Sequence, residues 1–134
     1  MPLIVALLVI GLASVTAAGD STTTLRGEVR DADSKQPVPC RLYVNSADGA
    51  KWFFPKSAEP GGSALVYDRA REKSVEKHVT LSAHPFVVEL PPGKYVFTAE
   101  RGKEYLTTTR EIEVGREPVG IALEIKRWVN MAGR

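Results

Sequence analysis

Apolar and polar residues alternate with a period of two along most of this chain, whereas a helical repeat is nearly absent after residue 18. In the first half, the segments TTLRGEVR and VPCRLYVN each place three small or apolar residues on one face. These inward positions are Leu25, Gly27, Val29, Cys40, Leu42 and Val44. The turn sequences DADSKQP and SADG follow the two segments, so the pattern predicts successive β-strands.

The second half of the chain shows the same pattern more clearly. FVVEL, KYVFTAER, YLTTTREIEV and VGIALEIK alternate in this way, and PPG, a glycine and GREP separate them. Their inward rows include Tyr95, Phe97, Ala99, Val119, Ile121, Leu123 and Ile125. ALVYD and HVTLS also have strand character, and the polar run between them fits a surface turn or a short helix. The sequence therefore predicts an all-β, antiparallel sandwich of about seven or eight short strands.

Residues 2–18 form an uncharged, largely apolar stretch that ends in the small residues SVTAA. This composition is typical of a secretory signal peptide that is cleaved after Ala17 or Ala18. Because the start amine is the one positive group in front of it, an uncleaved membrane anchor stays open as the alternative. We expect a signal-peptide helix over 1–18 and a secreted protein, located in the periplasm or outside the cell.

Composition narrows the class of protein further. The net charge of +2 is small and the signs are mixed, which argues against nucleic acid as a partner and against membrane contact beyond the signal segment. Cys40 is the only cysteine, so no disulfide can form within the chain, and we expect a buried thiol. We predict one domain over 19–127, followed over 128–134 by a C-terminal tail or a truncated interdomain linker.

Two stretches carry a family resemblance. LRGEVRDADSKQPVPCRLYV and FVVELPPGKYVFTAERG resemble the carboxypeptidase regulatory-like family, whose transthyretin-like domains are Greek-key sandwiches. More narrowly, PVPCRLYV, FFPKS, GGSALVYD and RWVNMAGR resemble the N-terminal module of secreted PHP-type, carbaryl-hydrolase-like metallohydrolases. The resemblance implies an accessory module. The family's metal-binding His-x-His segment does not occur in this sequence, so no catalytic residue, metal ligand or cofactor is carried over.

Three consecutive aromatic residues, Trp52, Phe53 and Phe54, are the first candidate contacts for a ligand or partner. A strand cannot bury all three on one face, so at least one should point away from the core or cover a rim. An exposed aromatic side chain can stack on a sugar ring or anchor a partner domain. The alternative is that the flanking loop folds over them. Three tyrosines could extend such a platform: Tyr43, Tyr67 and Tyr105.

Trp128 and Met131, with Val129 between them, are the second set of candidate contacts. They follow the last predicted strand and look like the start of an interdomain packing surface, unless they fold back on the sandwich as a tail. His78 and His84 are too few for a metal site, which needs three or four protein ligands.

Three functions compete at this point. We expect a non-catalytic accessory or interaction module that meets a protein domain. The alternative is a free-standing carbohydrate-binding sandwich whose partner is a polysaccharide. An enzyme of the hydroxyisourate-hydrolase kind shares the broad sandwich, but that family ends in Tyr-Arg-Gly-Ser, whereas this chain ends in NMAGR.

Overall fold

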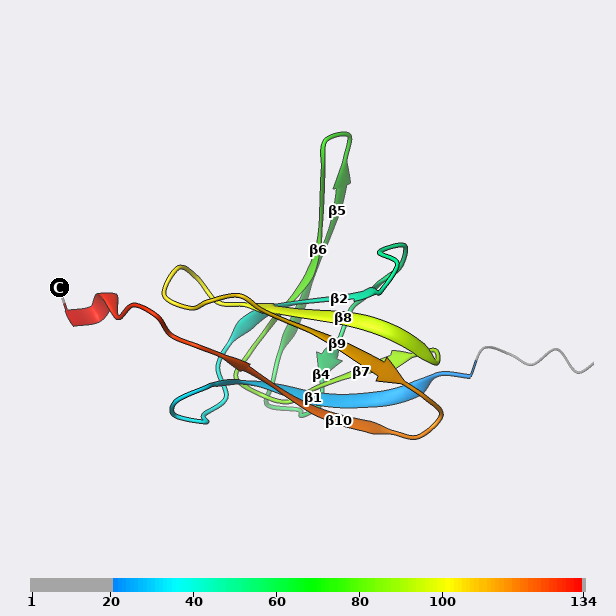
Figure 1. Ribbon diagram of the computed structural model, residues 1–134, viewed down its shortest axis with the longest axis horizontal. Coiled ribbons are helices and arrows are strands. Elements are labelled where there is room, and N and C mark those ends of the chain that lie inside the picture. Colours follow the sequence, from blue (N-terminus) through cyan, green and yellow to red (C-terminus); the bar gives the residue numbers. More distant parts are fainter. Residues whose placement is uncertain (1–20, 134) are drawn as a thin grey trace, which may run out of the picture.

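Two β-sheets face each other in the computed structural model, which describes residues 21–133 (Figure 1). The predicted signal-peptide helix over 1–18 lies outside the described residues. One sheet has the strand order β10 (Val119–Ile125), β1 (Thr23–Asp31), β7 (Phe86–Leu90), β4 (Lys56–Ser57). The other has the order β5 (Ala64–Arg71), β6 (Ser74–Leu81), β2 (Cys40–Ser46), β8 (Gly93–Glu100), β9 (Thr108–Val114), with β3 (Trp52–Phe53) also beside β2. The prediction of an all-β fold is confirmed.

The described strands pair antiparallel, except that β10 lies parallel to β1. Leu25 pairs with Val119 and Asp31 with Ile125 in this parallel register. β10 follows β9, which belongs to the other sheet, so the chain crosses between sheets before β10 begins. A crossing of this kind allows a parallel pair, which a tight hairpin does not. The predominantly antiparallel sandwich that the sequence predicts therefore contains one parallel pair.

The core lies between the two sheets, and the predicted inward rows form it. Alternate residues are buried over 23–29 in β1, 40–44 in β2, 86–90 in β7 and 95–99 in β8, as the alternation requires. Phe86 and Phe97, from opposite sheets, stack with their ring centroids 6.4 Å apart. Cys40 is buried in the same cluster, as expected, and burial raises the pKa of its thiol to about 12. The thiol is therefore part of the core packing.

Gly27 lets β1 approach the aromatic core closely. A Cβ at this position would lie 2.5 Å from Cζ of Phe86 and 2.9 Å from Cγ1 of Ile121. No side chain fits there unless these neighbours move. The absence of a side chain at Gly27 thus sets how closely the Phe86 ring packs under β1.

β5 and β6 form a hairpin that projects away from the two layers (Figure 1). The polar run between Asp68 and His78 was expected to form a surface turn or a short helix. The alternative of a short helix is wrong, because both strands continue through the run. The turn between them is confined to Glu72 and Lys73. β6 pairs with β2 only from Val79 to Leu81, so the outer half of the hairpin is exposed.

The substitution Gly27→Ala should lower the free energy of unfolding by about 1–3 kcal/mol, because the added methyl overpacks the contact with Phe86. Urea denaturation of both proteins measures this difference. Gly120→Ala is the matched control: Gly120 lies on the neighbouring strand β10, and a Cβ there meets nothing within 4 Å. That variant should be neutral or stabilised by up to about 1 kcal/mol. Equal effects of the two substitutions would contradict the close packing.

Candidate functional site

The aromatic triplet Trp52–Phe54 lies where the chain crosses from one sheet to the other. β3 pairs with β2 in the six-stranded sheet, and β4 pairs with β7 in the four-stranded sheet. Only Phe54 and Pro55 lie between β3 and β4. The crossing therefore takes two residues, and Pro55 is fully buried within it.

The crossing divides the three aromatic side chains between two environments. Phe53 pairs with the buried Val44, and it packs with Phe54 against the core cluster. Trp52 pairs with Asn45, so it lies on the outer face of the sheet, because cross-strand partners share a face. The prediction that at least one of the three points away from the core is confirmed, and that residue is Trp52.

A wedge-shaped hollow opens where the crossing chain leaves the edge of β7. β4 pairs with β7 only at Val87 and Phe86, so the crossing segment diverges from β7 beyond Val87. The hollow between them is lined by Phe53, Phe54, Lys56, Val87, Val88 and Glu89. We call this hollow the wedge. It has an aromatic wall, and a cationic and an anionic side chain lie at its rim.

The carboxylate of Glu89, a lining residue of the wedge, is held on the β1 side of β7, whereas β4 lies on the other side of β7. Its Oε1 accepts a hydrogen bond from the hydroxyl of Thr24 at 2.6 Å, and its Oε2 accepts one from Thr22 at 3.2 Å. Thr24 is the direct cross-strand partner of Glu89 on β1. Each carboxylate oxygen can accept more than one hydrogen bond, so Glu89 remains an available acceptor with a fixed position.

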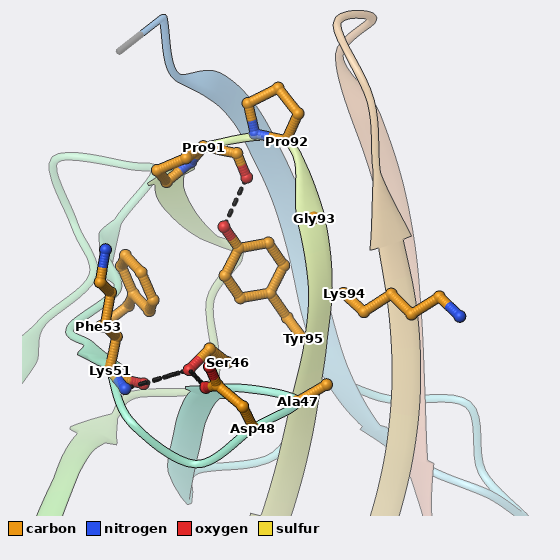
Figure 2. Close-up of a pocket in the computed structure, with 10 residues that line it drawn as sticks. All are labelled: Ser46, Ala47, Asp48, Lys51, Phe53, Pro91, Pro92, Gly93, Lys94 and Tyr95. Carbon is orange, nitrogen blue, oxygen red and sulfur yellow. Dashed lines mark hydrogen bonds between the residues drawn. The ribbon is translucent and has the colours of Figure 1, made fainter.

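A second hollow lies on the other side of Phe53, between the β2–β3 and β7–β8 turns (Figure 2). The rings of Phe53 and Tyr95 meet edge to face there, with their centroids 5.3 Å apart. The buried Tyr95 hydroxyl donates to the carbonyl of Pro91, and burial raises the pKa of Tyr95. This hydrogen bond fixes the Pro91–Gly93 turn. The polar groups around the hollow mainly support the two turns.

An aromatic row crosses the outer face of the six-stranded sheet. His78 lies between Tyr43 and Tyr67, with ring centroids 5.2 and 5.1 Å away, and the guanidinium of Arg69 covers the Tyr67 ring. His78 is 5% exposed. Tyr43 and Tyr67, which the sequence offered as extensions of the Trp52–Phe54 platform, thus flank His78, and Tyr105 lies elsewhere.

His78 carries an unsatisfied buried nitrogen. Its Nδ1 lies 3.4 Å from Oε1 of Glu76, but no hydrogen bond reaches it from the residues that the structure describes. Burial lowers the pKa of His78, and the carboxylate of Glu76 opposes this shift only in part. Burial between the two tyrosine rings therefore favours the neutral imidazole.

Tyr105 anchors the chain after β10 to the sandwich. Its ring lies between the guanidinium groups of Arg101 and Arg127, at 5.5 and 5.1 Å from the ring centroid. Its hydroxyl donates to Oδ2 of Asp31 at 3.2 Å. Backbone hydrogen bonds from Ser34 and Asp33, and this one from Tyr105, lower the pKa of Asp31. Tyr105 therefore links β1, the β8–β9 loop and the C-terminal segment.

The segment after β10 is held by its backbone, while its apolar side chains stay in solvent. The backbone N–H of Trp128 donates to Glu104 O at 2.9 Å, and its indole N–H donates to Lys103 O at 2.8 Å. The side chain of Glu104 also accepts from the backbone N–H of Met131. Even so, Trp128 is 61% exposed and Met131 59%. Leu106 is 52% exposed.

Residues 21–133 contain neither a cluster of metal-binding side chains nor a helix that could span a membrane. No three His, Cys, Asp or Glu side chains gather within residues 21–133 in a way that could hold a metal ion. Nδ1 of His84 lies 2.9 Å from the hydroxyl of Ser82. Among the same residues, no helix has the length and apolarity to cross a bilayer.

Sequence reasoning identified some of these residues and missed others. It singled out two sets, Trp52, Phe53 and Phe54, and Trp128 and Met131, and the structure divides them among three regions because Trp52 is separated from Phe53 and Phe54. It missed Lys56 and Glu89, because each looked like the polar phase of an ordinary surface. A charged residue just after an aromatic triplet was the one available signal, for Lys56.

The free energy of unfolding should decrease as the pH falls below about 6.5, the ordinary pKa of histidine. As the pH falls, His78 is protonated in the unfolded chain before it is protonated in the folded protein, because folding lowers its pKa. The free energy of unfolding therefore keeps decreasing until the pH is below the pKa of His78 in the folded state. Urea denaturation at pH 5, 6 and 7 measures it.

His78→Phe should remove this pH dependence while keeping an aromatic ring between the tyrosines. His84→Gln is the matched control, since the chain has two histidines, and it should keep the dependence. The buried, neutral state of His78 would be contradicted if wild type and His78→Phe had the same slope between pH 5 and 7.

A scan against models of known protein families finds no match to this chain, and a search among curated proteins finds no similar one. Function therefore has to be argued from the residues and their geometry.

Proposed function

We propose that this protein is a secreted, non-catalytic β-sandwich module that docks against a second protein domain. Its two facing sheets agree with the transthyretin-like Greek-key domains of the carboxypeptidase regulatory-like family, to which the motifs around Gly27 and Pro91–Gly93 bear a resemblance. The uncharged segment over 2–18 supports secretion, to the periplasm or beyond the cell.

The exposed apolar side chains of the C-terminal segment and the adjoining loop carry this proposal. Leu106, Trp128 and Met131 are all more than half exposed. Apolar surface of this kind gains about 25 cal/mol for each Å² that a partner removes from water. Tryptophan and methionine are also enriched at protein–protein interfaces. A docking surface explains why such side chains remain in solvent.

The backbone of this segment is already ordered, which favours docking. Hydrogen bonds to Lys103 and Glu104 fix Trp128, and Arg127 pairs with both the Tyr105 ring and the Glu104 carboxylate. An interface built on an ordered segment loses less conformational entropy on binding than one built on a free tail. The segment therefore presents its apolar groups in a fixed direction.

The resemblance suggests which domain the module meets. The closing sequence RWVNMAGR resembles the junction at which secreted PHP-type metallohydrolases pass into their catalytic domain. On this proposal, the module supports such a domain, and the metal chemistry belongs to the partner.

Photo-crosslinking tests the docking surface. With p-benzoylphenylalanine in place of Met131, irradiation of cells that make the protein natively should give one dominant adduct, to a metallohydrolase-type catalytic domain identified by mass spectrometry. The same group in place of Leu65, which is 67% exposed on the distant β5–β6 hairpin, is the control and should give several-fold less of that adduct.

Two results would contradict the proposed function. One is an equal yield from both positions, or adducts without a catalytic domain. The other is hydrolysis of ester or phosphoester substrates by the purified chain with added Mn²⁺ or Zn²⁺, which would show catalysis by the module itself.

A further inference from the structure

We infer that the wedge is a carbohydrate-binding subsite that takes one ring of a neutral sugar chain. This activity goes beyond docking and uses other residues. The wedge is lined by residues of 53–56 and of β7, and the docking segment lies past the end of β10. In Figure 1 that end of the chain lies apart from β4 and β7. A sugar and a partner domain can therefore bind at the same time.

The sheet crossing builds the wedge and limits its size. Strand β4 lies beside β7 at Val87, and immediately before β4 the chain arrives from the other sheet through Pro55. The hollow is thus short, and Val87, Val88 and Glu89 are the residues of β7 that line it. An added peptide strand would need a longer free edge, because β-augmentation depends on a run of backbone hydrogen bonds. A single ring fits this short opening better.

The chemistry of the lining matches the two kinds of surface on a pyranose. Phe54 is half-buried, and with Phe53 and Val88 it gives an apolar wall against which the C–H face of a sugar can lie. Glu89, fixed by Thr24, accepts hydrogen bonds from sugar hydroxyls, and the Lys56 ammonium donates to a ring or hydroxyl oxygen. An apolar wall with a few placed polar groups is typical of a small-ligand site.

The charges at the rim favour a neutral ligand. Lys56 and Glu89 contribute one positive and one negative charge to the lining, and no other lining residue is charged. An anionic or cationic ligand therefore gains no net attraction, whereas a polyhydroxyl ligand can use both groups as hydrogen-bond partners.

Trp52 is not part of this subsite. It lies on the outer face of the six-stranded sheet, and it is not among the residues that line the wedge. The sugar contact that the sequence suggested for the whole aromatic triplet is thus assigned to Phe54 and Phe53.

The test is an amide NMR titration of the full chain with four neutral oligosaccharides: cellohexaose, xylohexaose, mannohexaose and hexa-N-acetylchitohexaose. At least one should give saturable shifts centred on Val87, Val88 and Glu89. Phe54→Ala and Glu89→Gln should each weaken its binding by about tenfold, through loss of the apolar wall and of a charged acceptor. Glu113→Gln, an exposed carboxylate on β9, is the matched control and should leave binding unchanged.

Three results would overturn the subsite: no saturable shift with any of the four sugars, shifts centred elsewhere, or equal affinity of wild type and Glu89→Gln. Glu89 is exposed, so its variant should fold even if Phe54→Ala does not. The crosslink at position 131 does not involve the wedge. A negative sugar titration would therefore not affect the docking proposal, and a negative crosslink would not affect the sugar subsite.

Discussion

The two-residue crossing at Phe54 and Pro55 is the constraint on which the surfaces of this molecule depend. A strand with a period of two cannot bury three aromatic side chains in a row. By changing sheets after Phe53, the chain keeps Phe53 and Phe54 against the core and leaves only Trp52 on the outer face. The same change of sheet ends the pairing with β7 early, and this opens the wedge.

The rest of the sandwich holds this crossing in place from both sides. Tyr95 packs edge to face against Phe53 and fixes the Pro91 turn through its hydroxyl. On the other sheet, Thr22 and Thr24 hold the carboxylate of Glu89 on the β1 side of β7. Tyr105 plays the same positioning role for the C-terminal segment, which it ties to Asp31. In each region, buried or paired groups fix the backbone and leave a few side chains exposed for contacts.

The sequence was informative where burial alternates and uninformative where it does not. The inward rows of β1, β2 and β8 follow from alternation alone, because a one-residue shift would turn every apolar side chain to solvent. The β5–β6 hairpin could not be predicted in the same way, since most of its residues are exposed on both faces and show no contrast.

The candidate sites were predicted only in part, for a related reason. Trp52 could be expected to face outward, since the triplet itself requires it. Lys56 and Glu89 line the same hollow because β4 pairs with β7, and Tyr43 and Tyr67 flank the buried His78 from two neighbouring strands. Pairing between strands that are distant in the sequence cannot be read from the local pattern of residues.

The central claim is that the sheet crossing divides the aromatic triplet between core and surface. Nuclear Overhauser contacts of the aromatic protons test it most directly. The structure predicts strong contacts between the rings of Phe53 and Tyr95, whose centroids are 5.3 Å apart, and none between the Trp52 indole and Tyr95. Contacts from the Trp52 indole to Tyr95, without those of Phe53, would show the opposite register and contradict the account.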